Sequence, residues 1–429
     1  MRWVGRVVLV VALIVITAFV GVTLVRAQPS EVWVDDSWSG SNPGDPVDGH
    51  TFAANAFVTI QEGINAVASP GTVHVAAGTY YENITLKDGV EVLGAGADVT
   101  TVDGGGSGSV VIAVDVGSAV KLDGFTITNG SADYGGGIQC SFLTIISCTI
   151  VNNSASNGGG GIWFNYASPT IINCIISGNN ANAGGGIGFE GDSSTPYMSN
   201  NIISQNNADW GGGIYSGWQS SPTITNNTII GNDSSLGGGI RLIASYPIIS
   251  NNIIASNLAD ADGGGIHCDN LSSPTIGYND VWGNINRWSN TSGDYYGCVA
   301  GQNDISQDPT FVNSSAGDYH LKPNSPCIDA GDNNAATTAG LTTDFEDSLR
   351  IIDGDDDSSA VVDMGADEYV PLIPGDATGD GQVNAQDITS VERIIAGLDT
   401  ITLGADANQD GVVNALDITK TEMLVAGLD

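Results

Sequence analysis

The middle of the chain alternates short apolar runs with polar turns that are rich in glycine and asparagine. The apolar runs consist mostly of isoleucine, valine and threonine, which are typical of β-strands. The tetrapeptide Gly-Gly-Gly-Ile recurs between these runs, and its copies end at Ile138, Ile162, Ile187, Ile214, Ile240 and Ile266. The intervals are 24, 25, 27, 26 and 26 residues. Such regular spacing predicts an architecture of stacked repeats.

Each repeat contains three predicted strands. The first begins at the isoleucine of Gly-Gly-Gly-Ile, the second follows a proline turn such as Ser221-Pro222, and the third follows polar residues such as Asn200-Asn201. A polar turn then closes the unit, with asparagines at matching places: Asn179, Asn206, Asn232 and Asn257. We expect these asparagines to stack as a ladder, each side-chain amide bonding to the coils above and below.

Short β-branched strands of this kind cannot bury a face alone, but stacked units bury one continuous apolar column. Helical repeats are excluded, because no stretch of the repeats combines ten glycine-free residues with a 3.6-residue period. Parallel connections between strands are right-handed. The predicted fold class is all-β: a right-handed parallel β-helix over residues 28–302, with about ten coils of 24–27 residues.

The start of this region has its own pattern. Residues 59–67 predict a short amphipathic helix with Ile60, Ile64 and Val67 on one face. Strands are predicted at residues 73–75, 78–86 and 90–94. With its Thr-Ile-Gln opening and the run Gly-Thr-Tyr-Tyr-Glu-Asn-Ile-Thr-Leu, the stretch resembles the pectin-lyase-like β-helix superfamily. The resemblance extends over roughly residues 31–300. It implies an N-terminal cap and the fold, and it does not specify an activity.

A non-repeating segment, residues 303–370, follows the repeats and ends in Val-Asp-Met-Gly-Ala-Asp-Glu-Tyr. A solenoid end exposes unpaired strand groups, so a capping segment is expected there. The segment resembles the C-terminal part that often follows such helices in bacterial surface proteins. Its acidic run at residues 353–357 has two interpretations, a solvated loop or a cation site.

Residues 371–374 form a short linker to the last region, 375–429, in which one pattern occurs twice. Oxygen-bearing side chains occupy positions 1, 3, 5, 9 and 12 of each copy, glycine occupies position 6, and position 7 offers a backbone carbonyl. This is the pattern of a calcium loop, and its loose spacing suits calcium better than magnesium. We expect two Ca²⁺ ions, one in each loop. The predicted ligands are Asp376, Thr378, Asp380, Gln382, Asn384 and Asp387, then Asp406, Asn408, Asp410, Val412, Asn414 and Asp417.

A helix is predicted after each loop, at residues 388–396 and 418–426. An EF-hand pair is disfavoured, because position 12 is aspartate rather than glutamate and no helix precedes either loop. With its duplicated loop and helix, the region resembles a type I dockerin, a calcium-binding module that docks its carrier onto a cohesin domain of a partner protein. The resemblance implies cohesin contacts at loop positions 10 and 11, which are Ala385, Gln386, Ala415 and Leu416. These pairs differ between the copies and lack the hydroxyl pair of the best-known dockerins, so they do not identify the cohesin.

Residues 1–27 have the pattern of a secretory signal peptide. Arg2 and Arg6 precede an apolar run from residue 7 to 25, and cleavage is expected after Ala27. A retained membrane anchor is the alternative, because a run of this length can span a bilayer. No second apolar run of this kind occurs in the sequence. The rest of the chain is therefore expected outside the cell, secreted or attached to a surface through cohesin, without membrane contact after signal cleavage.

The charge of the chain narrows the choice of partners. A net charge of −37, from 48 acidic and 11 basic residues, disfavours nucleic acid and anionic lipid and suits calcium. The cysteines are widely spaced and form no zinc pattern. Both disulfides and buried free thiols are compatible with an exported solenoid.

A candidate surface site follows from strand geometry. If the isoleucine of each Gly-Gly-Gly-Ile points inward, the next residue points outward and stacks on its neighbours in adjacent coils. Aromatic residues in or near this row offer flat surfaces for polysaccharide: Trp163, Trp210, Tyr215 and Trp218. The catalytic candidates are Arg241, Glu190, Asp269 and His267. The alternative interpretation is an ordinary solvated sheet surface.

Two chemistries are compatible with the residues of this surface. Arg241 is the candidate base of a pectate-lyase-like β-elimination, which would also require a further calcium ion on the β-helix. A glycoside hydrolase would instead need two carboxylates at a defined separation. The β-helix polygalacturonase signatures Asn-Thr-Asp, Gly-His-Gly and Arg-Ile-Lys are absent from the sequence.

Two functions remain compatible with these features. Dockerins mostly carry polysaccharide-degrading enzymes, so the resemblance implies a carbohydrate-active β-helix that serves polysaccharide catabolism. The second hypothesis is a non-catalytic adhesin or structural protein of the cell surface. The sequence leaves open whether the chain is an enzyme.

Overall fold

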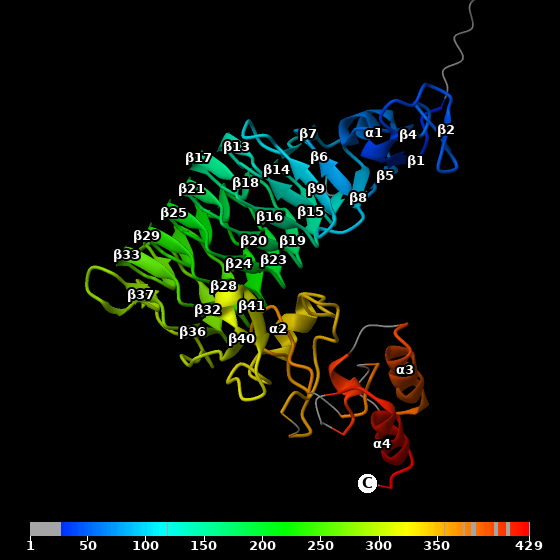
Figure 1. The fold of residues 1–429 in the computed structure, drawn as a ribbon. Helices are drawn as coiled ribbons and strands as arrows, with labels where there is room; N and C mark the ends of the chain where they lie inside the picture. The colour runs from blue at the N-terminus through cyan, green and yellow to red at the C-terminus, as the bar shows by residue number, and fades with distance from the viewer. Residues whose placement is uncertain are drawn as a thin grey trace, which may run out of the picture.

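The structure is a computed structural model that describes residues 27–117, 119–355, 357–371, 374–378, 383–398, 402–408 and 412–428. The predicted signal peptide lies outside the described residues, apart from Ala27. Figure 1 shows short strands stacked coil upon coil, with a yellow and orange segment beside the later coils and two helices near the C-terminus. No helix in the described ranges is long and apolar enough to cross a membrane.

The described part of the solenoid consists of four sheets, numbered I to IV here, in which almost every strand pairs in parallel with the equivalent strand of the next coil. Sheet I has the order β35(Thr275–Gly277), β31(Ile248–Ser250), β27(Thr223–Thr225), β23(Tyr197–Ser199), β19(Thr170–Ile172), β15(Leu143–Ile146), β11(Val120–Asp123), β8(Val90–Gly94), β5(Gly71–Val75), β1(Glu31–Val34) and β4(Ala56–Phe57). Sheet II, which holds the Gly-Gly-Gly-Ile strands, has the order β39(Tyr295–Tyr296), β34(Ile266–Cys268), β30(Ile240–Ile243), β26(Ile214–Gly217), β22(Ile187–Glu190), β18(Ile162–Asn165), β14(Ile138–Cys140), β10(Val111–Ala113) and β7(Ile84–Thr85).

The other two sheets complete the coils. Sheet III has the order β36(Asp280–Trp282), β32(Ile253–Ala255), β28(Thr228–Ile230), β24(Ile202–Ser204), β20(Ile175–Ser177), β16(Thr149–Val151), β12(Thr126–Thr128), β9(Thr100–Asp103) and β6(Gly78–Tyr80). Sheet IV has the order β13(Ser131–Tyr134), β17(Ser154–Gly158), β21(Asn180–Ala183), β25(Asn207–Trp210), β29(Asp233–Leu236), β33(Leu258–Asp262), β37(Ile285–Asn286) and β38(Thr291–Ser292). The about ten turns of this solenoid confirm the predicted β-helix.

Sheet IV replaces a predicted turn. The sequence indicated three strands and a polar turn in each repeat, whereas the structure has a fourth short strand at that place. In this strand a small residue such as Ala181 or Ala208 is buried, while the residues on either side of it are exposed. This is strand alternation with a period of two, but the inward positions hold alanine or serine rather than large apolar residues. The polar composition therefore concealed the strand.

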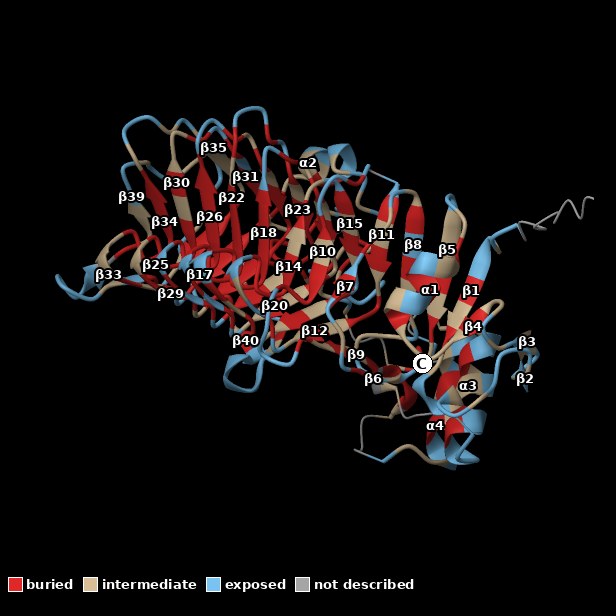
Figure 2. Ribbon diagram, turned by 90° about the horizontal axis from the view of Figure 1, so that it is seen from above, coloured by how far each residue is buried: buried red, intermediate tan, exposed pale blue. Residues whose placement is uncertain are grey.

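The core of the solenoid is a stack of inward-facing isoleucines. The isoleucines that end the Gly-Gly-Gly-Ile copies pair in register from coil to coil and are fully buried. Beside them Phe164 and Phe189 stack with ring centroids 4.7 Å apart. Figure 2 shows the buried parts of these strands in red. Burial of each such side chain stabilises the fold by about 1.5–3 kcal/mol.

Two ladders of buried asparagines run along the turns inside the solenoid. The first consists of Asn153, Asn179, Asn206, Asn232, Asn257 and Asn284 and ends at Asp294. The second consists of Asn201, Asn227, Asn252 and Asn279 and ends at Asp304.

At each step between asparagines the backbone N–H and Nδ2 of one residue donate to Oδ1 of the next. For Asn206 and Asn232 both distances are 3.0 Å. The last residue of each ladder only accepts hydrogen bonds from it, so an aspartate is suited to that position. The predicted asparagine ladder is confirmed, and the second ladder is an addition to it.

The first coils are closed by the predicted helix, α1(Ile60–Ala66). The Thr59 hydroxyl accepts from Glu62 N at 3.2 Å and caps the helix. Ile60, Ile64 and Val67 are buried, as the amphipathic pattern indicated. A hairpin of β2(Pro46–Val47) and β3(His50–Thr51) and the short η1(Asp36–Trp38) lie in the same N-terminal region.

Residues 303–370 lie along the flank of the later coils. They contain the hairpin β40(Phe311–Asn313) and β41(Asp318–Leu321), with η2(Ser314–Ala316) in its turn, and α2(Asn333–Thr338). Phe311, Leu321 and Cys327 pack with Ile253 and Ala255 of β32, so the segment covers part of the outer face of sheet III. We call it the flank segment.

A fully buried arginine organises the flank segment. Arg350 donates to the carbonyl oxygens of Asp363, Gly365 and Ala366. Its Nη1 lies 3.7 Å from a carboxylate oxygen of the equally buried Glu368. Because a buried guanidinium is costly without such partners, these contacts tie residues 350 and 363–368 together.

The six cysteines divide into two groups. Cys268 and Cys298 form a disulfide that joins sheet II to the last coil. The other four, Cys140, Cys148, Cys174 and Cys327, are free and buried. Both of the alternatives left open by the sequence therefore occur.

Candidate functional site

The two C-terminal helices are α3(Ala385–Ile395) and α4(Ala415–Val425), and each begins with the same capping box. In α3, Asn384 Oδ1 accepts from Gln386 N at 2.9 Å, and Asp387 Oδ2 accepts from Asn384 N at 2.7 Å. The equivalent bonds in α4 involve Asn414, Leu416 and Asp417. Both helices therefore begin three residues earlier than predicted, because loop position 9 is the N-cap.

The first loop brings three predicted ligands together. Asp387 Oδ1 accepts from Thr378 N at 2.9 Å and from Thr378 Oγ1 at 2.8 Å. Thr378 Oγ1 also lies 3.2 Å from Asp376 Oδ1. Burial acts to raise the pKa of Asp387, but hydrogen bonds from Asn384 and Thr378 outweigh it, and the pKa lies below its ordinary value. Loop positions 1, 3 and 12 thus meet as an oxygen-only donor set, which suits calcium.

The second loop has the same geometry where it is described. Asp417 Oδ1 accepts from Asn408 N at 3.1 Å, as Asp387 does from Thr378. Asp387 and Asp417 are both fully buried. Asp380, Gln382 and Asp410 lie outside the described residues, so the structure does not place these predicted ligands.

The two copies share one small core. Ala377, Val391, Ile394 and Ala405 are buried together, and Val413 and Ile418 pack against them. The short η3(Leu403–Ala405) joins the copies, and Thr402 Oγ1 donates to Ala377 O at 2.9 Å. The duplicated pattern therefore folds as one unit with two loops.

The predicted cohesin contacts lie in the first turns of α3 and α4. Ala385, Gln386, Ala415 and Leu416 are all exposed, and 62% of the Leu416 surface is accessible. An apolar side chain so exposed is available to a partner.

On the β-helix, the predicted outward row is in register along sheet II. The row runs through Gln139, Trp163, Gly188, Tyr215, Arg241 and His267 and continues to Tyr296. Two of its aromatic residues are covered, however. Only 7% of Trp163 and 2% of Tyr215 is accessible.

The cover comes from neighbouring turns and side chains. The Trp163 ring packs against that of Tyr134 in a tilted arrangement, with ring centroids 4.9 Å apart, and lies close to Gly158 and Gly188. Trp210 and Trp218 are exposed by 43% and 60%. The structure therefore leaves two of the four predicted sugar platforms accessible, and Trp210 of sheet IV and Trp218 after β26 lie on different elements.

The four predicted catalytic residues separate into different contacts. Arg241 Nη1 and His267 Nδ1 lie 2.6 Å apart. Burial and then the charge of Arg241 lower the pKa of His267 to about 4, so its neutral ring accepts this hydrogen bond. Burial also lowers the pKa of Arg241. The pair is thus partly withdrawn from solvent.

The two candidate carboxylates, Glu190 and Asp269, form hydrogen bonds with residues other than Arg241 and His267. Glu190 accepts from Tyr215 Oη at 3.1 Å. Asp269 Oδ1 accepts from Ala244 N, Ser272 N and Ser272 Oγ at 3.0, 2.8 and 2.7 Å, so this carboxylate holds a turn. The described contacts do not assemble the four residues into one constellation, and their catalytic roles stay predictions.

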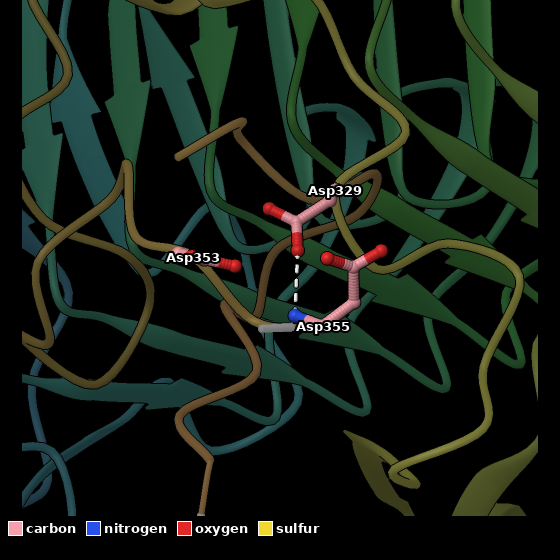
Figure 3. Close-up of side chains that lie close together, drawn as sticks. All are labelled: Asp329, Asp353 and Asp355. Carbon is pink, nitrogen blue, oxygen red and sulfur yellow. Dashed lines mark hydrogen bonds between the residues drawn. The ribbon is translucent and has the colours of Figure 1, made fainter. Parts of the chain in front are cut away.

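Asp353 and Asp355 of the acidic run form part of a carboxylate cluster (Figure 3). Oxygen atoms of Asp329, Asp353 and Asp355 lie within 4.8 Å of one another. Asp329 Oδ2 accepts from the backbone N–H groups of Gly354 and Asp355, both at 2.8 Å. Asp329 was not among the predicted residues, because it lies 24 positions before Asp353 in a different segment.

A second group was missed by the sequence analysis. Asp318, His320, Glu346 and Asp367 surround a cleft between the flank segment and sheet III. These residues belong to non-repeating segments up to 49 positions apart. The nearest signal was the alternation of polar and apolar residues in Asp318-Tyr319-His320-Leu321, which indicates a strand but not its neighbours.

Comparisons with known proteins agree with this architecture. The family model for a right-handed beta helix region matches residues 144–316, and that for a dockerin type I domain matches residues 374–421. No curated protein sequence matches the chain.

Two solved structures are similar at low scores. ORF18 of Geobacillus virus E2 is 14% identical, with a TM-score of 0.34, over 64% of this chain and 60% of that one. This chain therefore spans less than two thirds of the viral protein. Pectin methylesterase from carrot is 14% identical, with a TM-score of 0.29, over 66% of this chain and 90% of the enzyme. Neither score supports an inference about function. The chain therefore contains a right-handed β-helix region and, C-terminal to it, a type I dockerin domain.

Proposed function

We propose that this chain is a secreted protein that binds two calcium ions in residues 375–429, docks there onto a cohesin domain, and presents its β-helix to polysaccharide. The observation that supports it most is the convergence of Asp376, Thr378 and Asp387 in the first loop. The buried Asp387 carboxylate both starts α3 and closes the loop. Calcium bound there would therefore order the helix whose first turn carries Ala385 and Gln386.

The two loops give the docking surface a repeated form. Ala385-Gln386 and Ala415-Leu416 are equivalent first-turn pairs on α3 and α4. Because the pairs differ in side chain, the two copies would bind a cohesin unequally, and the apolar Leu416 favours the second copy.

The role of the β-helix is proposed as polysaccharide binding, in support of polysaccharide catabolism. Trp210 and Trp218 are accessible for stacking on sugar rings. A non-catalytic adhesin is the second candidate, favoured by the different contacts in which Arg241, Glu190 and Asp269 are engaged.

The docking proposal is tested with the full chain and a panel of type I cohesin domains, in calcium and in excess chelator. We expect one or more cohesins to bind in calcium only, and Asp376→Ala combined with Asp406→Ala to abolish that binding. The matched control is Glu392→Ala with Glu422→Ala, equivalent exposed acids on α3 and α4 outside the loops. Binding that persists in chelator or in the loop variant would refute the proposal.

A further inference from the structure

A cleft of about 290 Å³ lies between the outer face of sheet III and the flank segment. We call it the flank cleft. Its floor includes the half-buried side chains of Ile175 on β20 and Ile202 on β24. Tyr319 and Phe345 line its walls, and its ionisable residues are Asp318, His320, Glu346 and Asp367. The cleft thus combines an apolar surface with a polar rim, as small-molecule sites do.

The polar rim is held together by one histidine. His320 Nδ1 lies 2.6 Å from Asp318 Oδ1, and His320 Nε2 lies 3.0 Å from Glu346 Oε2. Burial lowers the pKa of His320, but hydrogen bonds with Glu346 and Asp318 raise it more, to about 9. The ring is therefore cationic at neutral pH and holds both carboxylates in place.

Asp367 adds a third carboxylate beside this group. Its Oδ2 accepts from Leu321 N at 3.1 Å, and burial raises its pKa to about 6. Three carboxylates against one imidazolium leave a net negative charge around the cleft at neutral pH. A uronate, which is itself an anion, would be repelled there.

The shape and the hydrogen-bonding groups of the cleft indicate which uncharged ligand it would bind. A pyranose ring has an apolar C–H face and a rim of hydroxyl donors, which match an apolar floor and carboxylate acceptors. The volume of about 290 Å³ lies just below the range for ligand pockets, roughly 300–1,000 Å³, so the cleft suits a chain end or a branch rather than a polymer surface.

We propose that the flank cleft binds a terminal residue of a neutral saccharide, with its C–H face on Ile202 and Phe345 and its hydroxyls donating to Glu346 and Asp318. This inference rests on the proposed function, since it names a saccharide class and a place for the polysaccharide binding of the β-helix. It adds a cleft on sheet III to the exposed Trp210 and Trp218 as a place for that binding.

The test measures binding to the full chain by ligand-observed nuclear magnetic resonance and titration calorimetry. The probes are neutral oligosaccharides of glucose, xylose, mannose and galactose, with trigalacturonate and a simple alkylamine for comparison. We expect at least one neutral oligosaccharide to bind better than both comparison probes. Phe345→Ala and Glu346→Gln should each weaken its binding by roughly tenfold.

Trp288→Ala is the matched control for an exposed aromatic residue outside the cleft, and it should leave this binding unchanged. The Glu346 side chain is half exposed, so Glu346→Gln keeps the test valid even if Phe345→Ala lowers the unfolding temperature. Saccharide binding that survives both cleft variants would overturn the flank-cleft proposal and leave the proposed function standing. Tighter binding of trigalacturonate or the amine would overturn it as well. Absence of binding to any saccharide would contradict both proposals.

Discussion

The β-helix and the dockerin domain both bury polar side chains, but they bury different ones. The β-helix buries asparagines, which donate and accept hydrogen bonds in ladders such as Asn179, Asn206 and Asn232. The dockerin domain buries the carboxylates of Asp387 and Asp417, which only accept. In the β-helix, equivalent asparagines of successive coils therefore satisfy one another's hydrogen bonds. The dockerin domain instead brings oxygen atoms together in its loops.

Because of this difference, we expect the stability of the two regions to depend on calcium to different degrees. The amides of a ladder satisfy one another's hydrogen bonds without any ligand. Unfolding of the ladder would also expose the apolar core of the coils to water. Calcium loops gain order from the ion, because the binding free energy of the metal contributes to folding. We expect the β-helix to be stable in chelator and the dockerin domain to depend on calcium.

The largest effect is expected from removing both buried carboxylates. Asp387→Ala combined with Asp417→Ala should weaken calcium binding by at least roughly a hundredfold, because each residue is a proposed ligand and the N3 residue of a capping box. Calorimetric titration with calcium measures this loss. The variant with Glu392→Ala and Glu422→Ala should bind calcium like the original chain. Equal calcium binding by the two variants would contradict the proposed role of the buried carboxylates of Asp387 and Asp417.

The next effect concerns the ladder. Asn206→Ala leaves the N–H and Nδ2 donors of Asn179 without their acceptor. Two buried unsatisfied donors should lower the free energy of unfolding of the β-helix by about 3 kcal/mol. Denaturant unfolding followed by tryptophan fluorescence measures it. Asn207→Ala, at the exposed strand position next to Asn206, is the control and should have little effect. A small effect at Asn206 would show that the ladder is not a source of stability.

The next effect depends on pH and comes from a buried carboxyl group of the β-helix itself. Burial raises the pKa of Asp280 from 3.8 to about 7. Between these values the folded chain binds more protons than the unfolded chain, so this residue lowers stability as pH rises from about 4 to 7.

Asp280→Asn keeps an acceptor for Gln307 N and removes this titration. The variant should be more stable than the original chain by about 2 kcal/mol at pH 8 and nearly equal to it at pH 4. Thermal unfolding at the two pH values measures the difference. A constant difference across this range would contradict the assignment.

The smallest effect is expected at the docking surface. Leu416→Ala should weaken cohesin binding by roughly tenfold, because an exposed apolar side chain loses its buried contact with the partner. Calcium affinity should stay unchanged, because Leu416 contributes only a backbone N–H to the loop. Surface plasmon resonance with a cohesin domain that binds the original chain measures it. If Ala385→Gly weakened cohesin binding by a similar factor and Leu416→Ala did not, docking would be assigned to the first copy instead.

The fold was predictable where the sequence repeats. The spacing of Gly-Gly-Gly-Ile predicts the coils, and Asn179 and Asn206 predict a ladder, because identical residues in successive coils must meet. The fourth strand was missed, since Ala181 and Ala208 are too small to indicate an inward face. The burial of Trp163 was also missed, because it depends on Tyr134 in the preceding coil.

The candidate sites were predictable only where they are local. The predicted loop ligands lie within twelve consecutive positions, so spacing alone indicates them, and Thr378 contacts both Asp376 and Asp387. The flank cleft joins Ile202 to Glu346 across 144 positions of chain without a repeated pattern. Long-range contacts between non-repeating segments have no periodic signal, and only the folded structure reveals them.

Hydrogen–deuterium exchange of the full chain, with calcium and with chelator, tests the contrast between the two regions most directly. In chelator we expect α3 and α4 to lose protection, while the coils that contain the ladder from Asn153 to Asn284 keep theirs. Equal protection of α3 and α4 in both conditions, or loss of protection in the ladder coils, would contradict this account.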